Sequence, residues 1–397
     1  MTASETARRE IAALASENRL CYQCGQCTAV CPSGADLDAG PRRVMRYVLT
    51  EQVERLLESE DVWRCTGCGS CTDVCPMELD VAGTLARLRA LGHEGPGARC
   101  PERAAAQIAT RRLADHDEID SMAFGAAMAL RGHVPADVVS AAGAASRLVR
   151  HRLRRSSPGD PAAPASTATT PGAAAASRTP GAAQTFYPGC ALRQDPPLLA
   201  QTRTVASDLG LPLREPAGAV CCGHPSRGAR PSRFASDGEV LSACPACNSS
   251  LTESGVATKP LWEAIVDRAA RDGRRLRAAE PAFVPYVGCL SQRDAALAAL
   301  ASAGELAASS CLTSYPSLHA GCCGALGGMY RTETQATRRL LDYAAAREAP
   351  VVTICLLCRD NLRSAARRRG PSVPIYFWPE FFGAAGPAGA APGGDHD

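Results

Sequence analysis

Cysteine is the residue whose number and spacing stand out in this 397-residue sequence, which contains 20 of them. Eight cysteines form two short runs, CYQCGQCTAVCP and CTGCGSCTDVCP. In each run two residues separate the first three cysteines, a fourth follows after three more residues, and proline comes next, a spacing that binds [4Fe–4S] clusters in proteins. The two runs are copies offset by 44 residues: Cys21, Cys24, Cys27 and Cys31 recur as Cys65, Cys68, Cys71 and Cys75.

With this spacing, the first three thiolates bind one cluster and the fourth binds a neighbouring cluster. We therefore expect two clusters with ligands from both runs: Cys21, Cys24, Cys27 and Cys75 for one, and Cys65, Cys68, Cys71 and Cys31 for the other. Zinc is the alternative metal, but zinc sites usually use two separated cysteine pairs. Because each iron already has a protein ligand, we expect the two clusters to carry electrons rather than to bind a substrate.

Ten further cysteines form a second duplication in the C-terminal half of the chain. Each copy has one cysteine, then Cys-Cys-Gly, then Cys-x-x-Cys. Five thiolates exceed what one cubane cluster or one zinc ion binds, so each copy indicates either an unusual multi-iron cluster or a cluster beside a reactive thiol. The two copies contain Cys190, Cys221, Cys222, Cys244 and Cys247, and Cys289, Cys322, Cys323, Cys355 and Cys358.

Charge and hydropathy limit the partners and the location that we expect. Lys and Arg number 43 against 40 Asp and Glu, so charge gives no reason to expect a nucleic acid partner. No apolar run approaches the ~20 residues that span a bilayer, and the N-terminus is charged where a signal peptide is apolar. We predict a cytoplasmic protein that reaches a membrane only through a partner, and thiols in the cytosol are kept reduced.

The elements that position the cysteines follow from apolar periodicity. Residues 1–20 predict an amphipathic helix, a helix beginning near Pro41 separates the two runs, and residues 79–91 predict another helix. Beyond residue 184, short strand-like runs alternate with helical patterns, which is typical of an α/β domain. The strand-like runs are TFYP, EVLSA, FVPYV and VVTI.

We therefore predict a multidomain chain, with an α-helical ferredoxin-type domain followed by a duplicated α/β domain. A segment rich in Pro, Ala, Ser, Thr and Gly cannot bury a core and predicts a flexible linker between them. The basic stretch 147–155 is expected to be the solvated end of a helix, with a docking site for an acidic partner as the alternative. The expected units are 1–98 (ferredoxin-type), 99–155 (helical extension), 156–184 (linker), 185–278 and 279–383 (the two copies) and 384–397 (tail).

The motifs also carry a family resemblance. The C-terminal half resembles the CCG domains of the heterodisulfide reductase B subunit in the strings FYPGC, CCGHP, ACPACNSSL, CCGALGG and ICLLCRDNL. The N-terminal part resembles the C subunit of the same enzyme in CYQCGQCTAVCPSG, PRRVMRYVL and DVWRCTGCGSCTDVCPMELDVAG. The chain is thus similar to a natural fusion of the C and B subunits.

This resemblance implies one non-cubane [4Fe–4S] cluster per CCG motif, and the two face each other across the site of disulfide cleavage. Carried over residue by residue, each cluster uses the five cysteines of its own copy. The first copy departs from the family, because 21 residues separate Cys222 from Cys244 whereas 31 separate Cys323 from Cys355. It lacks the length of a short helix, so we expect one or two such clusters. The second copy opens YVGCLSQ, without the histidine often found there.

The expected function is that of an iron–sulfur oxidoreductase subunit. Electrons from a flavoprotein or other redox subunit would pass through the two N-terminal clusters to CCG clusters that reduce a disulfide or similar small acceptor, and the reverse direction stays open. The sequence lacks a Gly-x-Gly-x-x-Gly fingerprint, so the flavin is expected on another chain. One alternative is an electron-transfer subunit of a 2-hydroxyacid or glycerol-3-phosphate dehydrogenase that feeds quinone. Another is a non-catalytic carrier whose CCG units hold zinc or no metal.

Two histidines and two cysteines outside the repeats are weaker candidates. His224 directly follows one CCG motif and His319 precedes the other, so either could donate a proton to a leaving thiolate. The alternative is that each hydrogen-bonds a loop. Cys100 and Cys311 are expected to be small buried thiols, with a ligand or regulatory role as the alternative.

Overall fold

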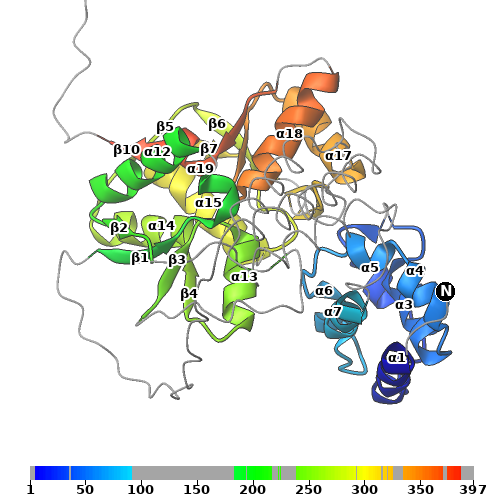
Figure 1. Ribbon diagram of the computed structural model, residues 1–397. Coiled ribbons are helices and arrows are strands. Elements are labelled where there is room, and N and C mark those ends of the chain that lie inside the picture. The colour runs from blue at the N-terminus through cyan, green and yellow to red at the C-terminus, as the bar shows by residue number, and fades with distance from the viewer. Residues whose placement is uncertain are drawn as a thin grey trace, which may run out of the picture.

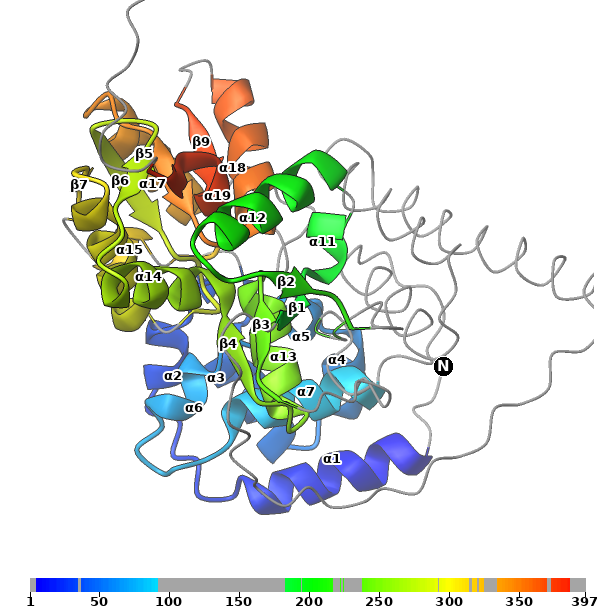
Figure 2. The same ribbon diagram turned by 90° about the vertical axis from the view of Figure 1, so that its left-hand side faces the viewer.

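A computed structural model of the chain describes residues 5–34, 37–91, 183–193, 195–216, 222, 224, 238–291, 293–313, 316–319, 321–324, 334–369 and 373–385. An N-terminal helical part comes first and an α/β part follows. In both views the N-terminal helices gather at one end of the molecule, against the α/β part (Figure 1, Figure 2). The helical extension, the basic stretch, nearly all of the linker and most of the tail expected from the sequence lie outside the described residues.

The N-terminal part consists of helices around a small apolar core that includes Ile11, Leu14, Val44 and Met45. The expected helix between the cysteine runs is divided in two, because Glu51 takes a left-handed backbone conformation (φ 48°) and interrupts it. The helices are α1 (Glu5–Glu17), α2 (Gln26–Ala29), α3 (Gly40–Leu49), α4 (Val53–Glu58), α5 (Asp61–Arg64), α6 (Ser70–Asp73) and α7 (Val81–Leu91).

The α/β part contains two four-stranded parallel sheets with the same strand order. The first has the order β2-β1-β3-β4 and the second β7-β6-β8-β9. All four strand-like runs of the sequence form strands, one pair at the centre of each sheet. The strands are β1 (Gln184–Tyr187), β2 (Leu213–Arg214), β3 (Val240–Ser242), β4 (Thr258–Pro260), β6 (Ala282–Tyr286), β7 (Ser310–Cys311), β8 (Val351–Thr353) and β9 (Ile375–Phe377).

Helices connect the parallel strands, and a small antiparallel sheet joins the two copies. β5 (Leu276–Ala278) pairs with β10 (Phe382–Ala384) near the C-terminus. β1 and β10 each include one residue, Gln184 and Ala384, that lies beyond the domain limits expected from the sequence. The helices are α11 (Gly189–Arg193), α12 (Pro196–Asp208), α13 (Pro245–Glu253), α14 (Leu261–Arg271), α15 (Arg293–Leu306), α16 (Pro316–His319), α17 (Gln335–Ala345), α18 (Leu356–Arg369) and α19 (Trp378–Phe381).

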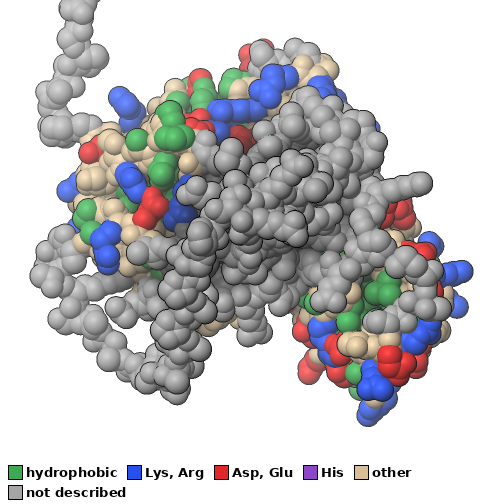
Figure 3. Space-filling view, in the orientation of Figure 1, with side chains coloured by type: hydrophobic (Ala, Val, Ile, Leu, Met, Phe, Trp, Pro, Cys, Tyr) green, Lys and Arg blue, Asp and Glu red, His purple; other side chains and the backbone are tan. Residues whose placement is uncertain are grey.

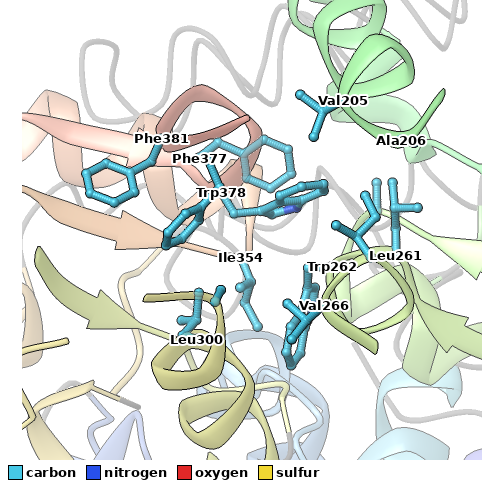
Figure 4. Packing of buried hydrophobic residues seen from close by; sticks show 14 of the residues in the cluster. Val205, Ala206, Leu261, Trp262, Val266, Leu300, Ile354, Phe377, Trp378 and Phe381 are labelled. Atoms are coloured by element: carbon cyan, nitrogen blue, oxygen red, sulfur yellow. The ribbon is translucent and has the colours of Figure 1, made fainter. Parts of the chain in front are cut away.

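One apolar core is shared by both copies. Val205 and Trp262 of the first copy belong to the same buried cluster as Leu300, Ile354 and Trp378 of the second. Figure 4 shows these side chains converging from both copies. Burial of apolar surface is the main favourable term in folding, so this core holds the two cysteine motifs in a fixed relation. Among the described helices, none is long and apolar enough to span a membrane.

Candidate functional site

Each N-terminal cysteine run folds as a loop that leads into a one-turn helix. Gly25 and Gly69 precede α2 and α6 with φ angles of 90° and 81°, a left-handed conformation that favours glycine. Thr28 and Thr72 follow the third cysteine of their runs. The hydroxyl oxygen of Thr28 accepts the backbone N–H of Arg42, and that of Thr72 accepts the N–H of Ala82, each at 2.9 Å. The two loops are therefore tied to α3 and α7 in the same way.

The fourth cysteine of each run lies with the other run. Cys31 interacts electrostatically with Cys65 and Cys68 of the second run. Tyr22 of the first run interacts with both Cys24 and Cys75. This exchange is the placement that the two predicted ligand sets require. Burial raises the pKa of the Cys31 thiol to about 12.

Hydrogen bonds to sulfur occur at matching positions of the two loops. Gly67 donates its backbone N–H to Sγ of Cys65 at 3.4 Å. Gln23, the residue 44 positions earlier, donates its side-chain Nε2 to Sγ of Cys21 at 3.3 Å. Both residues take a left-handed conformation, with φ of 69° and 63°. Donors of this kind stabilise negative charge on a cluster and tune its potential.

The five cysteines of the second CCG copy line one pocket. Sγ of Cys323 donates to Sγ of Cys358 at 3.3 Å. A hydrogen bond to Cys322, together with burial, raises the pKa of the Cys289 thiol. Gly288 has φ of 75°, and a Cβ there would lie 3.3 Å from Sγ of Cys358, so glycine leaves the space beside that sulfur open.

The described cysteines of the first CCG copy also lie together. Hydrogen bonds to Cys222 and Cys244, and burial, raise the pKa of the Cys247 thiol. A Cβ on Gly189 would lie 2.9 Å from Sγ of Cys247, closer than a real Cβ approaches. Cys190 lies in α11, whereas Cys221 and the segment in which this copy is shortened lie outside the described residues.

The two CCG copies meet at their Cys-x-x-Cys motifs. The thiols of Cys244 and Cys355 are hydrogen-bonded to each other, and Pro245 of the first copy lines the pocket of the second. Hydrogen bonds from Cys244 and Cys358 lower the pKa of the Cys355 thiol. The cysteine sites of the two CCG copies are therefore adjacent.

The residues around the ligands predicted for the second N-terminal cluster pack against both CCG motifs. Cys322 donates its backbone N–H to the carbonyl of Pro32 at 3.3 Å, and Cys31 interacts electrostatically with Cys322. Nε2 of His224 lies 3.0 Å from the carbonyl oxygen of Thr66, between Cys65 and Cys68 in the sequence. The N-terminal clusters and the CCG motifs are therefore expected to be neighbours.

Both candidate histidines contact backbone. His224 is 3% exposed and reaches Thr66, and His319 is fully buried with Nδ1 2.7 Å from the carbonyl oxygen of Pro285. Burial lowers the pKa of His319, which favours the neutral ring. Cys311 is half-buried in β7 against the shared core, and Cys100 lies outside the described residues.

Several residues that support the cysteines were missed in the sequence. Ser250 donates to the carbonyl of Cys222 at 2.6 Å, and Asn361 donates to the carbonyl of Cys323. Ser250 and Asn361 are 111 residues apart, the same offset as Cys244 and Cys355. Applying that offset to residues between and after the cysteines would have found this pair.

The donor set fits iron–sulfur clusters. Buried thiols with raised pKa values lose their protons only when a cation compensates the charge, so binding of a metal cluster must release protons. Among the described residues, no three His, Cys, Asp or Glu side chains are arranged to hold a single metal ion.

Two protein families match the chain. A 4Fe-4S dicluster domain matches residues 20–80, and a cysteine-rich domain matches residues 184–236 and 284–363. The second match includes all five cysteines of its copy, whereas the first ends before Cys244 and Cys247. No solved structure matches the chain.

Curated relatives match the N-terminal part. The C2 subunit of the H(2)/formate:CoB-CoM heterodisulfide,ferredoxin reductase of Methanococcus maripaludis is 43% identical over 58 residues, which is 15% of this chain and 29% of that protein. The C subunit of the ferredoxin:CoB-CoM heterodisulfide reductase of Methanosarcina acetivorans is 42% identical over 65 residues, 16% of this chain and 26% of that protein.

A third relative extends the same pattern. The iron-sulfur C 2 subunit of the CoB--CoM heterodisulfide reductase of Methanocaldococcus jannaschii is 46% identical over 48 residues, 12% of this chain and 25% of that protein. The chain spans less than a third of the length of these relatives. Together with the helical N-terminal part and the α/β copies, the matches describe a heterodisulfide reductase-like fusion of a 4Fe-4S dicluster domain with cysteine-rich domains.

Proposed function

We propose that the chain is the iron–sulfur subunit of a heterodisulfide reductase-like oxidoreductase, which carries electrons between a redox partner and a small disulfide. The N-terminal runs would hold two [4Fe–4S] clusters, with the fourth ligands exchanged between the runs. The CCG copies would hold one or two further clusters of the non-cubane kind. When bound, these groups supply single electrons, and two electrons with two protons convert a disulfide to two thiols.

The contact between the ligands predicted for the second N-terminal cluster and the second CCG motif carries this proposal. The hydrogen bond from Cys322 to Pro32 joins the residue after Cys31 to the first cysteine of a CCG pair. Cys68 and Cys289 also interact electrostatically across this boundary. We propose that electrons pass from the first run to the second run and then to the second CCG copy. They would reach the first CCG copy last, through the contact between Cys244 and Cys355.

The partner is proposed to dock at the first run. Leu20 and Tyr22 are 55% and 61% exposed. They are the most exposed large apolar side chains among the described residues. Cys24, in the loop that precedes α2, is exposed as well. Exposed apolar side chains on an otherwise charged surface mark interaction sites, and Figure 3 shows acidic and basic side chains intermixed over the visible N-terminal helices. A flavoprotein subunit is the partner that this surface would serve.

Anaerobic purification with bound partners, followed by EPR spectroscopy during titration with thiol–disulfide pairs, tests the function. A new paramagnetic signal that depends on the added pair is the expected result. In the Cys323→Ser variant the signal should be lost, whereas the Cys311→Ser variant, changed outside the pocket, should retain it.

Other outcomes point to the alternatives. No signal with any disulfide, together with turnover of quinone, would favour the dehydrogenase subunit. Zinc in place of iron at the CCG motifs would favour a simple carrier. Tyr22→Glu should slow reduction by the partner and leave reduction by dithionite unchanged, whereas equal loss with both reductants would contradict docking at Tyr22.

A further inference from the structure

The peptide that joins Thr66 to Gly67 makes hydrogen bonds at both of its ends. Its carbonyl oxygen, on Thr66, lies 3.0 Å from Nε2 of His224. Its N–H, on Gly67, donates to Sγ of Cys65 at 3.4 Å. One end of the peptide therefore contacts the first CCG motif, and the other contacts a predicted cluster ligand of the N-terminal part.

The direction of the first bond is fixed by chemistry. A carbonyl oxygen only accepts, so Nε2 of His224 must carry the hydrogen. Both groups are shielded from water, because His224 is 3% and Thr66 is 4% exposed. Hydrogen bonds in a low-dielectric environment are stronger than in water, and bonds in a chain polarise one another, by roughly 10–30% per bond.

We propose that His224 is a positioning residue that sets the reduction potential of the cluster held by Cys65, Cys68, Cys71 and Cys31. Donation to the Thr66 carbonyl polarises and orients the peptide, which strengthens the Gly67 N–H···S bond to Cys65. That bond stabilises the more negative, reduced cluster. The first CCG motif thereby adjusts the cluster that lies next to it. This inference rests on the proposed function, since it requires a cluster in the second run.

The first run supplies an internal comparison. At the matching position, Gln23 donates to Sγ of Cys21 with its own side chain, at 3.3 Å. The preceding Tyr22 is 61% exposed. Gln23→Leu should therefore lower the potential of the other N-terminal cluster, and it distinguishes the two signals in a titration.

The experiment is an EPR-monitored redox titration of the complete, anaerobically purified chain. His224→Phe keeps a ring of similar size and removes the donor. His224→Gln keeps a side-chain N–H that can reach Thr66. In His224→Phe the equilibrium constant for one-electron reduction of the second-run cluster should fall roughly threefold. The reduction potential should therefore fall by roughly 28 mV, because a tenfold change corresponds to 59 mV for a one-electron couple. His224→Gln should restore most of this shift.

Each other outcome is decisive. If both N-terminal clusters keep their wild-type potentials in His224→Phe, or if His224→Gln shifts the potential as far as His224→Phe, the inference is wrong. If His224→Phe does not fold, His224→Gln with a wild-type potential supports the inference and a lowered potential overturns it. A wild-type chain without N-terminal cluster signals would instead overturn the proposed function.

Discussion

The two N-terminal cysteine runs share their spacing but differ in their surroundings. The first run is open at its start, with Tyr22 61% exposed beside an exposed Cys24, and its last residue, Pro32, contacts a CCG motif. The second run lies against both CCG copies, through His224 and Cys289. Duplication thus supplies equal sets of ligands, and the neighbouring elements make one copy suited to a partner and the other suited to transfer within the chain.

In the α/β part, the second CCG copy shows how a neighbouring helix supports a cysteine motif. All five cysteines of the second copy line one pocket, and α17 begins after the CCG pair. Thr334, which caps α17, donates to the carbonyl of Cys322 at 2.7 Å. The start of α17 therefore supports the cysteine pair of the second copy directly. The comparison yields four predictions, each of which alters one copy and leaves its counterpart intact.

The largest effect is expected at the cysteines of the second copy. Cys323→Ser should remove about four iron atoms per chain, because a [4Fe–4S] cluster loses a ligand. Cys311→Ser, in the same copy but outside the pocket, should retain all iron. The measurement is iron and sulfide content after anaerobic purification, and equal iron content in the two variants would contradict the assignment.

A buried arginine provides the next test. Arg359 is 6% exposed and pairs with Asp195 of the first copy at 3.1 Å and with Glu380 at 3.0 Å. The matching residue of the first copy, Asn248, carries no charge. Arg359 also pairs with its neighbour Asp360 at 2.8 Å. Arg359→Met leaves these three carboxylates without this partner and should destabilise the protein by about 3 kcal/mol. Arg363→Met should cost about 1 kcal/mol or less, because its side chain is 34% exposed.

Denaturant unfolding of the complete chain, followed by circular dichroism, measures this difference. The transition of Arg359→Met should occur at a clearly lower denaturant concentration than that of Arg363→Met. Equal midpoints for the two variants would show that the pair between the copies adds little.

A carboxylate before the second run should have a smaller effect. Asp61 is 2% exposed and accepts the backbone N–H groups of Asp38, Ala39 and Gly40 at the start of α3. Asp61→Ala leaves these donors without their acceptor and should cost roughly 2 kcal/mol. Glu17, 44 residues earlier, has a side chain 55% exposed, so Glu17→Ala should cost roughly 0.5 kcal/mol.

Thermal unfolding of the N-terminal part, followed by loss of the visible absorption of its clusters, compares the two variants. The prediction fails if Glu17→Ala lowers the transition temperature as much as Asp61→Ala does.

The smallest effect concerns alkaline pH. Burial raises the pKa of the Cys311 thiol from 9.0 to about 12. Folding therefore favours the protonated thiol, and its contribution to stability is present below pH 9 and is lost as the pH rises toward 12. Leu213 is the counterpart in the first sheet, so Cys311→Leu makes the copies alike. This variant should lose less stability than the wild type in that pH range, and parallel losses would contradict the prediction.

The sequence predicted the elements that have strong local signals. Short apolar runs led to β1, β3, β6 and β8, and the 3.6-residue pattern led to α1, α3 and α7. It did not predict α13 and α18, which both begin within the Cys-x-x-Cys motifs. Cysteine chemistry dominated the interpretation of those residues, although Pro245 at the first turn is a helix-start signal.

The arrangement of the sites was beyond the sequence for a physical reason. His224 and Thr66 are 158 residues apart, and Arg359 and Asp195 are 164 apart. Spacing within a motif reports which residues share one loop, but contacts between loops depend on how whole units pack. The same limit applies to the Cys244–Cys355 contact, because each cysteine was assigned to its own copy.

Iron and acid-labile sulfide analysis of the anaerobically purified, reconstituted chain tests the central claim most directly. Three or four [4Fe–4S] clusters predict about twelve to sixteen iron atoms per chain. A colourless protein that binds no iron would contradict the account, because its thiols would then not be cluster ligands.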